Sequence, residues 1–281
     1  MKQWDSVAIV GVGLIGGSIG LGLRDRGLAR QVVGIARREA SLRVAKRMGA
    51  VTKGTLDLAR GVNGAELVIV CTPVARIAAD ARASAEVCRQ GGLITDVGST
   101  KAEIVAALDG ALSREVRFLG SHPLAGSEKS GPAAAAADLF VDRTVVVTPT
   151  RATRKEDLAS LEAFWTALGA RVIRMSPEAH DRALAATSHL PHLAASALAA
   201  CTPQGDLGLT ASGWVDTTRV AAGDPELWQQ IFMSNRANVL TALARYEKVL
   251  DSLRRCLEQG NKRKLTAILQ EGKQKRDALA S

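Results

Sequence analysis

Short runs of hydrophobic residues alternate with longer amphipathic segments through the first 175 residues. Such runs, bounded by polar or glycine positions, predict buried strands, whereas apolar positions repeating every three or four residues predict helices. The predicted strands are Val7–Val10, Gln31–Ala36, Leu67–Cys71, Leu93–Asp96, Thr144–Val147 and Arg171–Met175. The predicted helices end at Arg26 and near Gly49 or cover Ala83–Gln90, Lys101–Leu112 and Thr153–Leu168. This alternation is typical of an α/β fold with a Rossmann-type, doubly wound parallel sheet.

The pattern changes after Ser176, and the rest of the chain is predicted to be helical. Long helical periodicity, with one interruption rich in glycine and aspartate, covers Glu178–Cys201, Leu227–Cys256 and Lys262–Leu279. Pro191 lacks an amide donor and is expected to kink or locally open the first of these helices. We therefore predict a sheet domain at 1–175 and an all-helical domain at 176–281, with a dimer interface in the helical domain.

Composition and charge narrow the choice of partners. Of the 281 residues, 47% are hydrophobic and 23% are charged, which is ordinary for a globular protein. The formal net charge of +9 is spread along the chain, and only 3% of residues are aromatic. A nucleic-acid partner is therefore disfavoured. We interpret the positive field as one that attracts a small anionic substrate and a phosphorylated cofactor.

The sequence gives no sign of a membrane span or a secretory signal. The uncharged run 7–23 approaches the length of a span, but six glycines interrupt it. The N-terminus lacks the basic start, apolar run and cleavage site of a signal peptide. The four cysteines are too widely separated to suggest a metal site or disulfides. We expect a cytoplasmic protein with no metal, no membrane partner and no nucleic-acid partner.

A glycine-rich turn follows the first predicted strand. Glycines with this spacing between a strand and a helix are typical of a dinucleotide site, because they allow a tight turn and the helix N-terminus faces the pyrophosphate. The pattern alone is weak, but the second predicted strand follows at the required distance. The residues expected to contact the cofactor here, and at the end of the third predicted strand, are Gly11, Gly13, Leu14, Ile15, Gly16, Cys71, Thr72 and Pro73.

The end of the second predicted strand bears on the choice of cofactor. An NAD site usually places an acidic residue there to bind the ribose hydroxyls, but this chain has Ala36 followed by Arg37 and Arg38. Two guanidinium groups would suit a ribose 2′-phosphate. NADP is therefore favoured over NAD, although Arg37 and Arg38 are also consistent with a solvated start of a helix.

Four sequence blocks occur in an order that resembles one known family. They are DVGSTK (96–101), GSHPLAGSEKSG (120–131), SHLPH (188–192) and GWVDTTRVAAGDPELW (213–228). Over nearly the whole chain they resemble the prephenate and arogenate dehydrogenases of tyrosine biosynthesis. The resemblance implies oxidative decarboxylation of a cyclohexadienyl acid, from arogenate to tyrosine or from prephenate to 4-hydroxyphenylpyruvate, with hydride transfer to NAD or NADP. It also implies a homodimer through the helical domain.

The resemblance implies two catalytic residues. His122 matches the histidine that accepts the proton of the substrate hydroxyl, a task that suits imidazole near neutral pH. Ser99 matches a serine that orients this hydroxyl, His122 and the nicotinamide. Interpreted without the resemblance, Ser99 is a candidate helix N-cap supported by Glu103, and the two roles are compatible.

Further residues are implied in substrate binding. Arg219 matches the arginine that binds the ring carboxylate with its guanidinium fork, and Asp216 is expected to hold or gate Arg219. His192 matches a histidine that contacts substrate, whereas His189 and His180 are interpreted as structural. A zinc site at His189 and His192 is disfavoured because no further ligand is nearby.

Ser127 and Glu128 match positions that line the substrate side chain. At that position prephenate carries a keto group and arogenate an amino group. A carboxylate at Glu128 would pair with the ammonium group of arogenate. The sequence therefore favours acceptance of arogenate, alongside prephenate.

Two alternative functions are consistent with parts of the sequence. A β-hydroxyacid dehydrogenase would combine the same two kinds of domain, but it relies on a catalytic lysine in the helical domain, whereas Lys101 and Lys129 precede that domain. A nucleotide-sensing protein without turnover would keep the glycine turn but would not need His122, Ser99 or Arg219.

Overall fold

The computed structural model describes residues 3–126 and 131–279. By its internal packing the chain divides into two compact units, residues 1–235 and residues 236–281, and each is described by itself below. The domain boundary expected after residue 175 stays a prediction.

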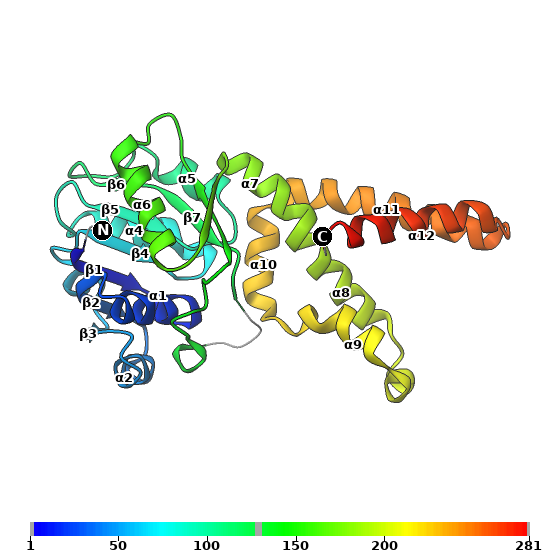
Figure 1. The fold of residues 1–281 in the computed structure, drawn as a ribbon, viewed down its shortest axis with the longest axis horizontal. Helices are drawn as coiled ribbons and strands as arrows, with labels where there is room; N and C mark the ends of the chain where they lie inside the picture. The colour runs from blue at the N-terminus through cyan, green and yellow to red at the C-terminus, as the bar shows by residue number, and fades with distance from the viewer. Residues whose placement is uncertain (1–2, 127–130, 280–281) are drawn as a thin grey trace. The chain divides into compact units, whose positions relative to one another are not determined.

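A six-stranded parallel sheet forms the core of the first unit, with strand order β3-β2-β1-β4-β5-β6 (Figure 1). Its strands are β1 (Trp4–Val10), β2 (Ala29–Ile35), β3 (Lys53–Thr55), β4 (Leu67–Val70), β5 (Leu93–Asp96) and β6 (Arg117–Phe118). The predicted Rossmann-type sheet is confirmed. The strand order reverses between β1 and β4, and in such sheets a ligand binds beyond the carboxyl ends of the strands at this point.

Helices connect these strands: α1 (Leu14–Asp25), α2 (Glu39–Arg47), α3 (Leu58–Val62), α4 (Val74–Ala85) and α5 (Ala102–Leu108). The helix predicted over Ala83–Gln90 is wrong. The chain is already helical from Val74, directly after Pro73, whose fixed φ suits a helix start. An ion pair between Arg76 and Asp80, four residues apart, supports this earlier helix.

A second sheet of three strands follows: β7 (Gly120–Pro123), β8 (Thr144–Thr148) and β9 (Arg171–Arg174). The predicted strands Thr144–Val147 and Arg171–Met175 were expected in the parallel sheet; this is wrong, because they form a separate sheet in which β8 is antiparallel to β7. Parallel neighbours need a crossover that is usually a helix, and the described part of the segment between β7 and β8 contains only the short η1 (Pro132–Ala134).

The two sheets share one hydrophobic core. Val7 and Ile9 of β1 belong to the same buried cluster as Val145 of β8 and Trp165 of α6 (Lys155–Ala167). The indole N–H of Trp165 donates to the hydroxyl of Ser121 on β7 over 3.1 Å. This packing fixes β7 beside β5, and β7 carries His122.

The first unit ends in helical segments: α7 (Pro177–Leu184), η2 (Ala185–His189), α8 (Leu190–Cys201), η3 (Gln204–Leu209), α9 (Ser212–Thr218), η4 (Arg219–Ala222) and α10 (Pro225–Ser234). The local opening expected near Pro191 is confirmed, since η2 is a π-helical segment directly before the turn that contains this proline. Such π segments are frequent at functional sites.

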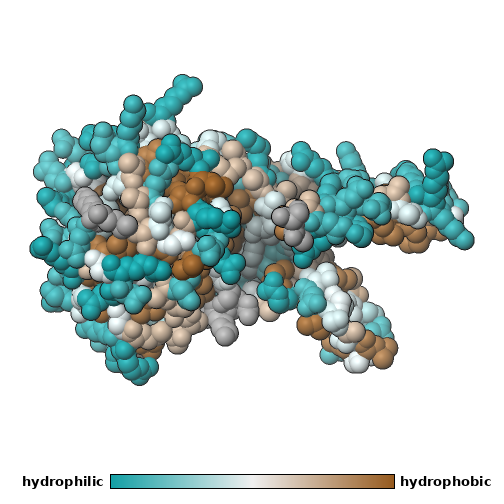
Figure 2. Space-filling model, viewed as in Figure 1, coloured by the Kyte–Doolittle hydropathy of each residue, from teal (hydrophilic) through white to brown (hydrophobic). Residues whose placement is uncertain are grey.

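The second unit is a hairpin of two helices, α11 (Arg236–Glu258) and α12 (Lys262–Asp277). The turn contains Gly260, with a φ of 61°, and Asn261, whose side chain accepts a hydrogen bond from the N–H of Lys264. Hydrophobic residues lie along this hairpin beside hydrophilic ones (Figure 2). Within the described parts of the chain, no helix is both long enough and apolar enough to cross a membrane.

Candidate active site

The glycine turn after β1 is built as a dinucleotide site requires. Gly11 has a φ of 103°, and a Cβ on it would lie 2.7 Å from the carbonyl oxygen of Cys71. A Cβ on Gly16 would lie 2.1 Å from the carbonyl oxygen of Gly11, so both positions need glycine. Gly13 differs, because its Cβ would meet nothing within 4 Å. Gly13 is the N-cap of α1 and provides no side-chain cap, so open space adjoins the start of this helix.

The ends of β2 and β4 flank this turn. Arg37 and Arg38 are exposed after the half-buried Ala36, and Arg38 occupies the N-cap position of α2. Cys71 follows β4, and burial raises the pKa of its thiol, which therefore stays protonated. The hydroxyl of Thr72 donates to Asp80 over 2.8 Å and so is engaged with α4.

A buried ion pair organises the loop after β5. The ammonium group of Lys101 pairs with the carboxylate of Asp96, and both side chains are fully buried. The N–H of Gly98 donates to Asp96 over 2.8 Å, and Lys101 Nζ donates to the carbonyl oxygen of Ser121 over 3.1 Å. Ser99 lies half-buried between these anchored residues.

The N-cap interpretation of Ser99 is wrong. The first helical residue of α5 is Ala102, and Lys101 occupies the N-cap position without a side-chain cap. The carboxylate of Asp181, distant in sequence, accepts hydrogen bonds from the backbone N–H groups of Lys101 and Ala102 over 2.8 and 2.9 Å. Glu103, which was expected to support the cap, instead accepts from the hydroxyl of Ser234.

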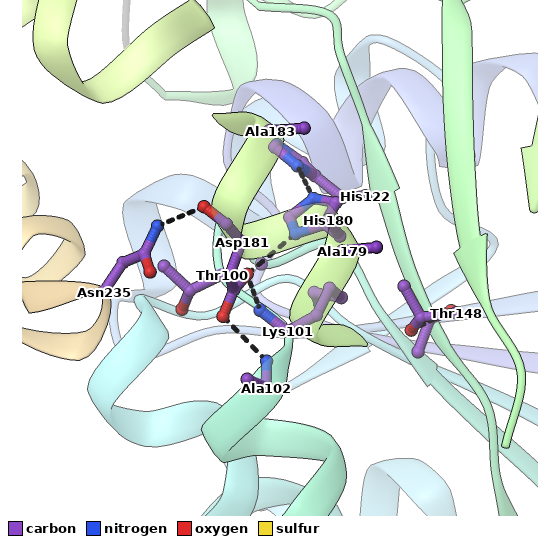
Figure 3. A network of polar contacts seen from close by, with 12 residues as sticks. Thr100, Lys101, Ala102, His122, Thr148, Ala179, His180, Asp181, Ala183 and Asn235 are labelled. Carbon is purple, nitrogen blue, oxygen red and sulfur yellow. Dashed lines mark hydrogen bonds and ion pairs between the residues drawn. The ribbon is translucent and has the colours of Figure 1, made fainter. Parts of the chain in front are cut away.

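His122 lies at one end of a hydrogen-bonded chain of three side chains (Figure 3). Its Nδ1 is 2.9 Å from His180 Nε2, and His180 Nδ1 is 2.8 Å from Asp181 Oδ1. All three side chains are buried. Sequence reasoning assigned only a structural part to His180 and missed Asp181. The available signal was that the two residues are adjacent near the start of the predicted helical segment 178–201, which also carries SHLPH.

The two remaining histidines lie on either side of the η2 to α8 junction. Asn235 Nδ2 lies 3.1 Å from His189 Nδ1, which accepts because an amide NH2 group only donates. Neither His189 Nε2 nor His192 Nδ1 has a hydrogen-bond partner among the described residues, although both atoms are buried. Trp228 of α10 stacks on the ring of His192.

Burial lowers the pKa of three imidazoles, those of His122, His189 and His192, and so favours their neutral forms. It is the largest cause that lowers the pKa of His122 well below its ordinary value, and any positive charge on His180, Lys101 or His189 lowers it further. Burial also lowers the pKa of His189 to about 4 and depresses that of His192. Among residues 3–126 and 131–279, no cluster of three or more His, Cys, Asp or Glu side chains is arranged to hold a metal ion.

The other predicted substrate residues are less tightly placed. Asp216 lies on α9 and Arg219 begins η4, and both side chains are exposed. Ser127 and Glu128 lie outside the described residues. The buried pair of Asp96 and Lys101 thus ties the loop that carries Ser99 to β7, because Lys101 also donates to Ser121, the residue before His122. The positions that line the substrate side chain are known from the sequence alone.

Comparison with known proteins identifies the family. The family model for the nucleotide-binding domain of prephenate dehydrogenase matches residues 19–174, and the model for its dimerization domain matches residues 176–271. A cyclohexadienyl dehydrogenase of Zymomonas mobilis is 34% identical, over 90% of this chain and 89% of that protein.

Two solved structures extend the match to the whole fold. The prephenate dehydrogenase of A. aeolicus, in complex with hydroxyphenyl propionate and NAD+, superposes with a TM-score of 0.90 at 32% identity and covers 98% of each chain. The arogenate dehydrogenase of Synechocystis superposes with a TM-score of 0.80 at 30% identity, over 98% of this chain and 99% of that one. The chain therefore belongs to the prephenate dehydrogenase family, and it is a nicotinamide-dependent dehydrogenase that oxidatively decarboxylates a cyclohexadienyl acid in tyrosine biosynthesis.

Proposed function

We propose that this enzyme accepts arogenate as well as prephenate and uses NADP+ in preference to NAD+. The observation that carries the cofactor proposal is the end of β2, where Ala36 replaces the usual acid and Arg37 and Arg38 are exposed. The substrate proposal rests on Glu128, a carboxylate that would pair with the ammonium group of arogenate.

The reaction places defined demands on the protein. The substrate carries a ring hydroxyl opposite a ring carboxylate. Hydride leaves the carbinol carbon, the hydroxyl proton leaves to a base, and the resulting dienone draws in the electrons of the breaking carbon–carboxylate bond as carbon dioxide departs. The phenolate oxygen formed in this way then regains a proton. The protein must therefore supply a base that returns its proton, a cation for the carboxylate and a fixed orientation.

His122 is the proposed base. Its Nε2 has no hydrogen-bond partner among the described residues, whereas its Nδ1 is engaged with His180. Ser99 sits in the loop that the Asp96–Lys101 pair fixes, and we assign its hydroxyl to orienting the substrate hydroxyl toward His122. The buried Asp96–Lys101 pair holds the loop of Ser99, and Lys101 also donates to the carbonyl oxygen of Ser121, the residue before His122. These contacts favour a constant geometry during turnover.

The ring carboxylate is assigned to Arg219, whose guanidinium fork suits bidentate recognition. Asp216, one helical turn earlier on α9, is assigned to holding or gating this arginine. His192 is assigned a substrate contact on the face that Trp228 does not cover. Ser127 and Glu128 are assigned to the substrate side chain on the sequence alone.

The residues at the glycine turn fit a nicotinamide dinucleotide. The open space next to Gly13 at the start of α1 is a cradle that a larger side chain would fill, and the N–H groups there favour a pyrophosphate. The backbone of Gly11, Leu14 and Ile15 completes this cradle in the proposal. When bound, the nicotinamide supplies the hydride acceptor. Cys71, Thr72 and Pro73 are proposed to contribute mainly through their backbone, since the Thr72 hydroxyl is engaged with Asp80.

We further propose a homodimer formed by residues 176–281. The matched family model for this region is described as a dimerization domain. On α11, large apolar side chains are exposed that a second copy would cover, and they include Leu240, Val249, Leu250 and Leu257. Light scattering tests this assembly directly.

The test of substrate and cofactor choice is a steady-state assay of reduced-nicotinamide absorbance that crosses prephenate and arogenate with NADP+ and NAD+. The double variant Arg37→Ala/Arg38→Ala should raise the KM for NADP+ by about tenfold or more, since a hydrogen bond to a charged group contributes about 1.5 to 3 kcal/mol. The KM for NAD+ should change little. Equal effects on both cofactors would contradict the role of the two arginines.

Glu128→Gln is the matched test of substrate choice. It should lower kcat/KM for arogenate relative to prephenate, because the amide keeps the size of the side chain but removes its charge. An unchanged ratio would remove the basis for the role of Glu128. Turnover of prephenate alone with NAD+ alone would leave the family assignment intact and overturn both finer proposals.

A further inference from the structure

The three buried side chains of His122, His180 and Asp181 form a continuous chain of hydrogen bonds that crosses from β7 to α7 (Figure 3). The proposed base is thus not an isolated histidine. Both ring nitrogens of His180 are engaged, one with His122 and the other with Asp181. The direction of donation along this chain decides which nitrogen of His122 carries a proton.

Asp181 fixes that direction at one end. Burial alone would raise the pKa of its carboxyl group, but the hydrogen bonds from His180 and from the backbone N–H groups of Ala102 and Lys101 outweigh burial and lower it. Asp181 is therefore an ionised carboxylate near neutral pH and can only accept hydrogen bonds. His180 Nδ1, at 2.8 Å from Asp181, must carry the proton of that bond.

The remaining assignments follow in sequence. In a neutral His180 with a proton on Nδ1, Nε2 holds a lone pair and accepts. His122 Nδ1, at 2.9 Å, must then donate, so it is protonated. This leaves the lone pair of neutral His122 on Nε2, the nitrogen without a described partner and the one assigned to the substrate hydroxyl.

The surroundings hold this arrangement in one position. Asp181 accepts from Lys101 N and Ala102 N at the start of α5, and its own carbonyl oxygen accepts from Asn235 Nδ2 over 2.7 Å. The carboxylate cannot rotate away without losing several buried hydrogen bonds. Because α5 begins directly after the Ser99 loop, the same carboxylate also fixes the position of that loop relative to His122.

The hydrogen-bonded chain of His122, His180 and Asp181 also has an electrostatic role. When His122 accepts a proton it becomes a buried cation, and burial together with the nearby charge of Lys101 opposes this. The groups that face it are His180 and Asp181 from α7, Lys101 from the α5 N-cap, itself paired with Asp96 of β5, and His189 from η2. Among the residues that the structure describes, Asp181 is the carboxylate joined to His122 through a hydrogen-bonded path, so it is the group placed to offset the new charge.

We propose that His180 and Asp181 are positioning residues of the reaction: together they hold His122 with Nδ1 protonated and Nε2 free to accept the substrate proton, and they stabilise the positive charge that His122 then carries. The proposal rests on the proposed role of His122 as the base. The proton balance is closed, because the proton taken from the substrate hydroxyl on Nε2 returns to the phenolate oxygen after carbon dioxide has left. An aspartate that sets the tautomer of a catalytic histidine has the same physical basis in serine hydrolases.

The tautomers can be observed directly in the full-length enzyme labelled with ¹⁵N-histidine. The chain has only four histidines, so two-bond ¹⁵N–¹H correlation spectra of the rings are assignable with single substitutions. Near neutral pH, His122 and His180 should both be Nδ1–H tautomers, and His189 should be the Nε2–H tautomer. A wild-type His122 with its proton on Nε2 would overturn the proposal, whatever the enzyme's activity.

Asp181→Asn provides the functional test. Its amide would donate to His180 Nδ1, reverse both hydrogen bonds and place the proton of His122 on Nε2. The kcat at neutral pH should fall by about 10²-fold to 10⁴-fold, the range expected from a wrong tautomer, with little change in KM. The NMR spectrum should show the reversed tautomers. A kcat within about threefold of wild type, or a loss of activity with unchanged tautomers, would contradict the proposal.

His180→Gln is a second test of the proposal that remains available if Asp181→Asn fails to fold. Its Oε1 can still accept from His122 Nδ1, so the tautomer is kept, but the neutral amide no longer links His122 to Asp181. The acid limb of the kcat/KM profile should move to lower pH because His122 becomes less basic. Asp157→Asn is the matched control, since Asp157 is also a buried carboxylate, but its ion-pair partner is Arg117 and not His122 or His180. An unshifted limb in His180→Gln, or an equal kcat loss in Asp157→Asn, would count against the proposal, whereas full activity of His122→Gln would instead refute the proposed base.

Discussion

The ring of His192 lies parallel to the indole of Trp228, with the ring centroids 3.6 Å apart and an interplanar angle of 15°. Gly223 closes the same corner, since a Cβ there would lie 2.6 Å from Trp228 Nε1 and 3.0 Å from His192 Cε1. The stack joins α8, which carries the predicted substrate residue His192, to α10. It fixes which face of the imidazole is available to a ligand.

We predict that Trp228→Leu raises the KM for the cyclohexadienyl substrate by about two- to tenfold, because an aromatic pair contributes about 0.5 to 1.5 kcal/mol beyond its buried area. The kcat should change less, since the His122 chain is untouched. Phe232→Leu is the control: its ring is tilted and 6.1 Å from His192, so its effect should be smaller. Steady-state kinetics of both variants test this prediction. If the KM of Trp228→Leu equalled that of Phe232→Leu, the stack would not position His192.

The buried pair of Lys101 and Asp96 yields a second prediction. Lys101→Met should lower the free energy of unfolding by about 3 to 5 kcal/mol, because it leaves a carboxylate buried without its cation. The double variant with Asp96→Asn should recover part of that loss. Arg30→Met, which removes an exposed ion pair with Asp5, should cost less than about 1 kcal/mol. Urea titrations give all three values, and an additive double variant would contradict the coupling.

A third prediction concerns acid stability. The pKa of His189 is lowered from 6.5 to about 4 in the folded protein, so above pH 6.5 the side chain is neutral in both states and contributes no pH dependence. As the pH falls from 6.5 to about 4, only the unfolded chain takes up this proton, and stability is lost. The full loss from this group corresponds to about 3 kcal/mol.

His189→Asn isolates the effect. It keeps an acceptor near the position of Nδ1 for Asn235 but cannot titrate in this range. Unfolding free energies measured at several pH values between 7 and 4, expressed as wild type minus variant, should converge or cross as the pH falls. A constant difference would mean that His189 titrates normally in the folded enzyme.

The local features of this fold could be predicted from the sequence. Strands such as β1 and β4 are buried hydrophobic runs, and the Gly11 to Gly16 turn has the glycine spacing of a dinucleotide site between a strand and a helix. The effect of Pro191 was also predictable, because the missing amide donor acts within its own helix. In each case the deciding physics lies within about one turn or one strand of the residue concerned.

The contacts that organise the site could not be predicted in this way. His122 and His180 are 58 residues apart, and Asp181 caps a helix that begins 79 residues before it. A buried histidine followed by aspartate has many structural explanations when its partners are unknown. The antiparallel β7 was missed for a related reason, because strand direction depends on a connection whose path is set by tertiary packing.

The glycine turn provides the last prediction, because two of its glycines differ in what surrounds them. Gly11→Ala should destabilise the protein and abolish cofactor binding, since its φ of 103° and the 2.7 Å approach of its Cβ to Cys71 O leave no room for a side chain. Gly13→Ala has an ordinary φ of −86° and open space around its Cβ. Its folding free energy should stay within about 1 kcal/mol of wild type.

Gly13→Ala should nevertheless weaken binding of the reduced nicotinamide cofactor by about tenfold or more, because its methyl group would occupy the space in which the pyrophosphate approaches the start of α1. Fluorescence titration measures this affinity, and thermal unfolding without cofactor measures stability. The two measurements separate two explanations of the glycine pattern. If Gly13 served the fold of the turn alone, Gly13→Ala would leave the cofactor affinity and the stability unchanged. Loss of affinity without loss of stability shows instead that the space beside Gly13 is kept open for the ligand.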